Sequence, residues 1–179
     1  RVTTDGLAVY AAGIAAAPVG EANLDNTPFL IFTVDSLSRR MDPEAFLPLF
    51  TEWEADLEQG LFLLPLEEHG LVYNDVQNPH SPYGFTDTIG KTGTLYMESL
   101  LYWRACRMME RMCKTYGIKN PDRFAKAAES VERSLSLLFD PAAGAFYAAT
   151  KDCHQYDIWG MAYMLYIGFP CSANEKQAV

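Results

Sequence analysis

The chain has 179 residues, of which 49% are hydrophobic and 13% aromatic, enough for the core of a compact domain. Its net charge of −9 at pH 7 argues against a protein that binds nucleic acid through the phosphates. The longest strongly apolar run, residues 61–66, is far shorter than the roughly 20 residues that cross a bilayer, so no membrane segment is expected. Composition does not indicate a cellular compartment.

Capping signals predict a helical hairpin in the first third of the chain. Thr27 followed by proline is typical of a helix start, and apolar residues then recur every three or four positions, which predicts a helix over residues 28–41. Asp42 followed by proline repeats the signal and predicts a second helix, with one apolar stripe, over residues 43–60.

The next helices alternate between two kinds. A helix over residues 88–116 is apolar around most of its girth, which is typical of an inner helix with neighbours on several sides. The following helix, over residues 121–138, has a single apolar stripe and is predicted to be an outer helix. A last helix over residues 158–167 is apolar nearly all round and is again predicted to be inner.

These elements predict an all-α fold of consecutive helical hairpins. An aspartate precedes each inner helix, namely Asp25, Asp87 and Asp157, with separations of 62 and 70 residues. Such hairpins need neighbours on both sides of each inner helix, so a repeat array must close into a ring or carry polar caps. We therefore expect the remaining hairpins of a ring, or another chain, as a partner.

One long loop, residues 73–93, concentrates groups that suit a sugar. It carries amides, a histidine, two carboxylates and several aromatic residues, and it leads into a predicted inner helix. Sugar hydroxyls need planar donors and acceptors, while the apolar faces of sugar rings stack on aromatic side chains. Residues 154–160 have a similar character, so carbohydrate is the predicted ligand.

Three segments resemble corresponding stretches of the six-hairpin (α/α)6-toroid glycosidases. This superfamily includes the glycogen-debranching amylo-1,6-glucosidases, glucoamylases, trehalases and processing glucosidases. The segments are Asp25-Asn26-Thr27-Pro28, Tyr83-Gly84-Phe85-Thr86-Asp87-Thr88-Ile89-Gly90-Lys91-Thr92-Gly93 and Gln155-Tyr156-Asp157-Ile158-Trp159-Gly160.

The resemblance implies a fold and a reaction. It implies that residues 1–179 form a single partial toroid domain, about half of a six-hairpin barrel, with a glycan pocket where the inner helices begin. It also implies hydrolysis of glycosidic bonds, typically with inversion, by one carboxylic acid and one carboxylate that activates water.

Asp87 is the predicted catalytic residue, as the water-activating base or as a clamp on the glycan. Ionisation of an aspartate at a helix start is stabilised by the helix dipole, which suits a base better than an acid. The predicted substrate-binding residues are Asp25, Asp75, His80, Tyr83, Lys91, Gln155, Asp157 and Trp159.

Structural alternatives accompany these assignments. Asp87 and Asp157 could serve only as helix caps, and His80 could be an exposed loop residue. A proton donor would need apolar surroundings, and Glu67, Glu68, Glu98 and Asp75 are the residues in or near the loops that could supply one.

No metal site and no other cofactor is expected. The three histidines show no close ligand spacing, and the glycines around Lys91 lack the full phosphate-loop pattern. The alternative function is a non-catalytic helical-repeat module that uses the same loops to bind a glycan or a protein partner.

Overall fold

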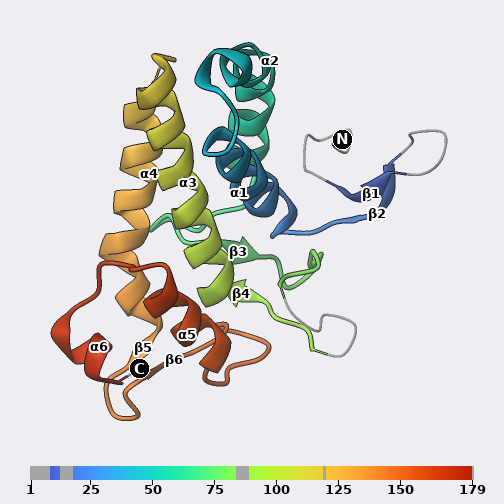
Figure 1. The fold of residues 1–179 in the computed structure, drawn as a ribbon. Coiled ribbons are helices and arrows are strands. Elements are labelled where there is room, and N and C mark those ends of the chain that lie inside the picture. Colours follow the sequence, from blue (N-terminus) through green and yellow to red (C-terminus); the bar gives the residue numbers. More distant parts are fainter. Residues whose placement is uncertain (1–8, 13–17, 84–88, 119, 179) are drawn as a thin grey trace.

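The computed structural model describes residues 9–12, 18–83, 89–118 and 120–178 (Figure 1). Its helices are α1 (Asn26–Ser38), α2 (Pro43–Phe62), α3 (Tyr96–Tyr116), α4 (Pro121–Ser134), α5 (Ile158–Tyr166) and α6 (Ala173–Ala178), with a 3₁₀ turn, Leu135–Leu138, after α4. The predicted all-α fold of consecutive helical hairpins is confirmed.

Strands in the described residues are short and form antiparallel pairs between the helices. They are β1 (Val9–Ala12) with β2 (Pro18–Ala22), β3 (Tyr73–Asn74) with β4 (Gly93–Thr94), and β5 (Phe139–Asp140) with β6 (Ala145–Phe146). Tyr73 pairs with Thr94 and Phe139 pairs with Phe146. The β3–β4 pair closes the base of the long loop that the sequence predicts to carry the site.

Helix α3 is the centre of the core. It packs against α1, α2, α4 and α5, and most of its side chains are buried, including Tyr96, Leu100 and Met109. Helix α4, in contrast, buries only one stripe, Phe124, Ala128 and Val131. The predicted inner and outer characters of these two helices are confirmed.

Helices α1 and α3 run in the same direction. The guanidinium of Arg104 lies 5.0 Å from the ring centroid of Phe32, and one turn or two farther along both helices Arg111 Nη2 lies 2.6 Å from Oδ1 of Asp35. Asp35 is 2% exposed and also pairs with Arg39. The order of these contacts makes the two helices parallel.

Helix α5 is also parallel to α3. Its first turn lies against Tyr96, at the start of α3, and Tyr163 farther along α5 accepts a hydrogen bond from Arg104 Nη1 at 3.0 Å. The rings of Tyr96 and Phe146 stack at 4.5 Å beneath this contact. The amino ends of α1, α3 and α5 therefore lie at one end of the molecule.

Close approach of α5 to α3 requires glycine at position 160. A Cβ there would lie 2.6 Å from Cδ1 of Tyr96 and 2.9 Å from Oδ2 of Asp157. We expect Gly160→Ala to lower the free energy of unfolding by about 2 kcal/mol, measured by urea denaturation, because the helices must separate. Gly90→Ala is the control, since a Cβ at that position meets nothing within 4 Å; equal losses in both variants would contradict this account.

Helix α3 begins later than the sequence predicts. The periodicity suggests a start near residue 88, whereas the helix begins at Tyr96 and residues 93–94 form β4. Gly93 has φ +84°, and a Cβ there would lie 2.3 Å from Oγ1 of Thr150. Strand pairing and this close approach keep the backbone extended before the helix starts.

Candidate functional site

Three carboxylates occupy the shared amino end of the inner helices. Asp25 precedes α1, Glu98 lies in the first turn of α3, and Asp157 precedes α5. Each has a buried oxygen without a hydrogen-bond partner in the described part of the chain: Oδ1 of Asp25, Oε2 of Glu98 and Oδ2 of Asp157. Because a buried acceptor without a donor is costly, these oxygens point to a ligand that donates hydrogen bonds.

Glu98 is the most deeply buried of the three carboxylates. Its side chain is 1% exposed, and Oε1 accepts a hydrogen bond from the backbone N–H of Tyr83 at 2.7 Å. Burial raises the pKa of Glu98 to about 7; Lys91 opposes this and Asp157 adds to it. Burial therefore favours the protonated form of Glu98 compared with an exposed glutamate.

Asp25 and Asp157 differ in how they meet their helices. Asp157 Oδ1 accepts a hydrogen bond from Gly160 N–H at 2.8 Å, so this residue does cap α5, with its second oxygen left over. The side chain of Asp25 makes no capping hydrogen bond to α1, and burial raises its pKa. Capping alone therefore accounts for one oxygen of Asp157 and for neither oxygen of Asp25.

The segment Ser81–Tyr83 connects the first two helix starts. The backbone N–H of Leu24 donates to Ser81 O at 3.1 Å, and two residues later Tyr83 is bound to Glu98. Residues 81–83 of the long loop thus contact both the segment before α1 and the first turn of α3. Asp157 acts electrostatically on Glu98, and Asp25 directly follows Leu24, which binds Ser81; we call the shared amino end with these three carboxylates the carboxylate neighbourhood.

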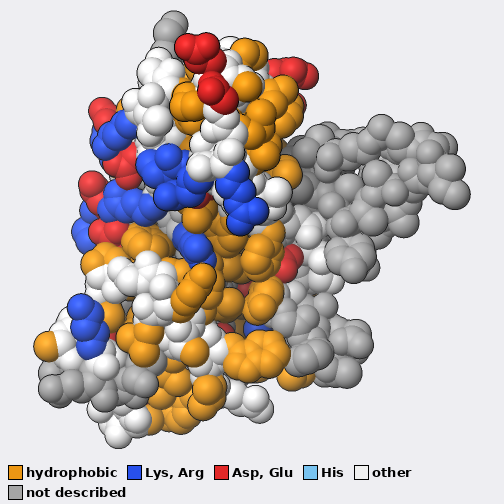
Figure 2. Space-filling view, in the orientation of Figure 1, with side chains coloured by type: hydrophobic (Ala, Val, Ile, Leu, Met, Phe, Trp, Pro, Cys, Tyr) orange, Lys and Arg blue, Asp and Glu red, His pale blue; other side chains and the backbone are white. Residues whose placement is uncertain are grey.

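Aromatic side chains border this neighbourhood. Phe29 is 40% exposed and Trp159 is 56% exposed, and the ring of Tyr83 lies 5.9 Å from that of Phe29. Figure 2 shows hydrophobic side chains over the lower part of this face, where Figure 1 places α5, and Lys and Arg gathered above them. Exposed rings beside carboxylates are the combination that binds sugars.

Two predicted site residues are engaged elsewhere. Asp75 is exposed, and its Oδ1 accepts hydrogen bonds from the backbone N–H groups of Gln77 and Asn78 at 2.6 and 3.0 Å, which forms a turn within the loop. Gln155 is exposed, and its backbone carbonyl pairs with Ala148. The described contacts do not bring either side chain to the three carboxylates.

Three more predicted residues, Lys91, His80 and Asp87, have different outcomes. Lys91 Nζ donates a hydrogen bond to the backbone carbonyl of Tyr83 at 2.8 Å. His80 is partly exposed, and its backbone is held by Asn74. Asp87, the predicted catalytic residue, lies outside the described residues.

Asn74 organises the loop, a role that the sequence argument missed. It is fully buried, its Nδ2 donates to the carbonyls of His80 and Lys91, and its Oδ1 accepts from His80 N–H at 2.8 Å. One side chain thus ties both ends of the loop together. An asparagine directly after three consecutive apolar residues, 71–73, was the local signal in the sequence.

Replacing Asn74 with alanine should therefore loosen the loop. Three backbone groups would lose their partner, and we expect the free energy of unfolding to fall by about 2 kcal/mol in urea denaturation. The matched control is Asn78→Ala, because Asn78 is exposed in the same loop. A loss no larger than that of the control would contradict the assigned role.

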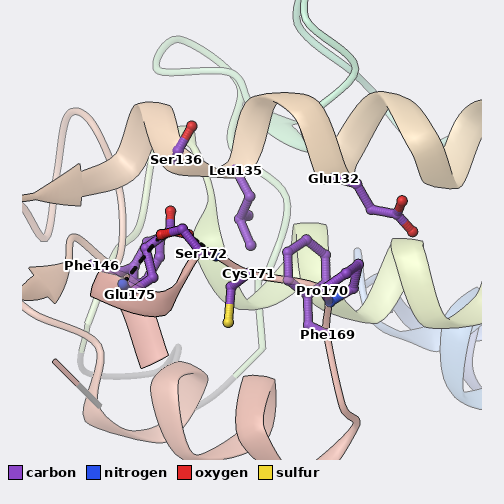
Figure 3. Close-up of a pocket in the computed structure, with 9 residues that line it drawn as sticks. All are labelled: Glu132, Leu135, Ser136, Phe146, Phe169, Pro170, Cys171, Ser172 and Glu175. Atoms are coloured by element: carbon purple, nitrogen blue, oxygen red, sulfur yellow. Dashed lines mark hydrogen bonds between the residues drawn. The ribbon is translucent and has the colours of Figure 1, made fainter. Parts of the chain in front are cut away.

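A separate cavity of about 310 Å³ lies between the end of α4 and the segment that leads to α6 (Figure 3). Its acidic groups already have partners: Glu132 accepts from Trp103 Nε1 at 2.7 Å, and Glu175 accepts from Ser172 N–H at 2.6 Å. None of the predicted site residues lines it. Its lining residues are Glu132, Leu135, Ser136, Phe146, Phe169, Pro170, Cys171, Ser172 and Glu175.

Neither a metal centre nor a membrane span is found in the described residues. No group of three or more His, Cys, Asp or Glu side chains there is arranged to hold a metal ion. No helix in the same part of the chain has both the length and the apolar character needed to cross a bilayer.

Two solved structures share this fold. A GH78 family rhamnosidase of Bacillus sp. GL1 matches 88% of this chain with a TM-score of 0.69 and 16% identity. A rhamnosidase from Klebsiella oxytoca, with rhamnose bound, matches 97% of it with a TM-score of 0.73 and 9% identity. No protein family model and no curated protein sequence matches the chain.

The match covers a part of each neighbour. The chain spans 17% of the Bacillus rhamnosidase and 33% of the Klebsiella rhamnosidase. With parallel inner helices and the outer helix α4, it is part of an (α/α)6 toroid, a fold of the glycosidase type. At these identities the likeness concerns the fold alone.

Proposed function

We propose that this chain is a glycoside hydrolase-like domain that binds an oligosaccharide at the shared amino end of α1, α3 and α5. One observation carries the proposal: Asp25 and Asp157, which precede two parallel helices, each have a buried carboxylate oxygen without a donor in the described residues. Sugar hydroxyls would supply those donors, and the exposed rings of Phe29 and Trp159 would cover an apolar sugar face. The fold shared with two rhamnosidases supports this choice of ligand.

The proposed reaction is hydrolysis with inversion. Asp87 would activate the water, while Asp25 and Asp157 would accept hydrogen bonds from sugar hydroxyls. Glu98, at 1% exposure and bound to Tyr83, is better suited to act through that residue than to reach a substrate. The proton donor is expected from further hairpins of the ring.

Residues 1–179 are proposed to form a single domain, about half of a six-hairpin barrel. Helix α5 leaves a broad apolar surface uncovered: Ile158 is 70% exposed, Leu165 48% and Tyr166 77%. An inner helix with one bare side needs a neighbour, which supports the remaining hairpins, or another chain, as partner. The same surface is what favours the alternative function, a non-catalytic module that binds a protein or a glycan.

A two-part assay tests the proposal. The protein is incubated with nitrophenyl glycosides, including the α-L-rhamnoside, and with short glucans, and binding of the same sugars is measured by calorimetry. Release of sugar supports the hydrolase, binding without release supports the module, and absence of both overturns the carbohydrate proposal. Asp25→Asn should weaken binding by about tenfold, whereas Asp122→Asn, exposed on α4, should not.

A further inference from the structure

Two side chains, one acidic and one basic, form hydrogen bonds with the backbone N–H and the backbone C=O of Tyr83. Oε1 of Glu98 accepts a hydrogen bond from Tyr83 N–H at 2.7 Å, and Nζ of Lys91 donates one to Tyr83 O at 2.8 Å. Glu98 comes from the first turn of α3, and Lys91 from the segment that precedes β4. Lys91 contributes a charged group to its hydrogen bond, and Glu98 does so when its carboxyl is ionised; such hydrogen bonds are among the stronger ones in proteins.

Glu98 and Lys91 bind the backbone of Tyr83 and do not pair with each other. No ion pair within 4.0 Å joins Glu98 to Lys91 in the described residues, although Lys91 acts electrostatically on Glu98. A partly buried lysine that reaches a backbone carbonyl gives up hydration to do so. This arrangement holds the two peptide planes that flank Cα of Tyr83, and with them the direction in which its side chain leaves the backbone.

Tyr83 also places an aromatic ring near the carboxylate neighbourhood. The ring of Tyr83 lies 5.9 Å from that of Phe29 on α1, with an angle of 40° between the planes. Burial, and to a smaller extent Tyr83, raises the pKa of Tyr163 on α5. The ring of Tyr83 therefore lies beside Phe29 on α1, and Tyr83 is near enough to Tyr163 on α5 to act on it electrostatically.

We infer that Glu98 and Lys91 are positioning residues that set the ring of Tyr83 as a stacking surface for a sugar. The inference rests on the proposed carbohydrate function, which it deepens by assigning the two charged residues a role through Tyr83. The described groups that act on Glu98 are Lys91 from the loop and Asp157 from α5, with the N–H of Tyr83 itself. Protonation of Glu98 weakens its hydrogen bond with Tyr83 N–H, while the hydrogen bond from Lys91 to Tyr83 O remains.

The hydrogen bonds of Glu98 and Lys91 with the Tyr83 backbone are tested directly by NMR, without any sugar. The amide ¹⁵N and ¹H shifts of Tyr83 should titrate with a midpoint near pH 7 in the wild-type protein, because Glu98 loses its proton there. In Glu98→Gln the titration should vanish, and in Lys91→Met its midpoint should rise, since Lys91 favours the charged form. Lys114→Met, at the other end of α3 and paired with Glu110, should leave the midpoint unchanged. A flat Tyr83 amide in the wild type overturns the inference.

Its consequence for the ligand is tested by a double-mutant cycle. Tyr83→Ala and Lys91→Met should each lower the affinity for the sugar that binds best in calorimetry by about tenfold. The double variant should bind that sugar no worse than Tyr83→Ala alone. Additive losses would mean that Lys91 acts independently of Tyr83 and would overturn the positioning role. Absence of sugar binding in the wild type would overturn the proposed function. The NMR titration tests the hydrogen bonds with the Tyr83 backbone independently of that result.

Discussion

Asp87→Asn should abolish sugar release and leave the fold intact. An amide cannot take a proton from water, so loss of a general base is expected to lower kcat by about a thousandfold. The expectation rests on the resemblance of the segment around Asp87 to the toroid glycosidases. Because α3 begins at Tyr96, nine residues later, the predicted position of Asp87 at a helix start is wrong and the helix dipole does not support its role. It is measured as kcat on the glycoside that the wild-type protein hydrolyses, with Tm as the check on folding.

The control for this variant is Asp75→Asn in the same loop. Oδ1 of Asp75 accepts two backbone hydrogen bonds, and the carbonyl oxygen of asparagine can accept both, so turnover should stay close to wild type. Full activity in Asp87→Asn would remove Asp87 from the mechanism. Equal losses in both variants would indicate damage to the loop instead of loss of a base.

Stability should fall as the pH rises from about 4.5 to 7, relative to Glu98→Gln. The pKa of Glu98 is raised from 4.5 to about 7, mainly by burial, so the folded state disfavours its ionised form. The contribution of Glu98 is therefore fully present below the unfolded pKa and is lost as the pH rises through the folded pKa. The gap between the two pKa values corresponds to about 3 kcal/mol.

Urea denaturation of both proteins at several pH values measures this effect. The difference in free energy of unfolding, wild type minus Glu98→Gln, should decrease through that window and become constant above pH 7, since other groups titrate alike in both proteins. Glutamine keeps an oxygen for Tyr83 N–H, so the variant should remain folded. Parallel curves for the two proteins would show that Glu98 titrates as an exposed residue does.

The assignment of the site to one end of the barrel depends on several elements at once. Asp25 and Asp157 precede parallel helices, and Glu98 opens the helix between them. Spacing in the sequence predicts aspartates at this end, whereas by sequence Glu98 is only one of four possible proton donors. Burial and the contact with Tyr83 now separate Glu98 from the other three.

The sequence by itself predicted the helices α1 to α5 in their order, although it missed α6 and placed the start of α3 too early. Asp42 before a proline accepts a hydrogen bond from Glu44 N–H, and Gly117 ends α3 with φ 69°, because caps and stops depend on backbone groups only a few residues away. The period of apolar residues likewise identified α3 as inner and α4 as outer, since one face or several faces of a helix must leave water.

Only the tertiary structure decided which polar groups meet. Arg111 binds Asp35 across 76 residues, Asn74 bridges to Lys91 across 17, and Glu98 finds Tyr83 instead of an arginine on its own helix. Burial and pKa depend on what distant segments place around a group, and local sequence carries no record of that. For the same reason the late start of α3 at Tyr96 follows from its pairing and close contact with residues near Thr150, beyond the reach of helical periodicity.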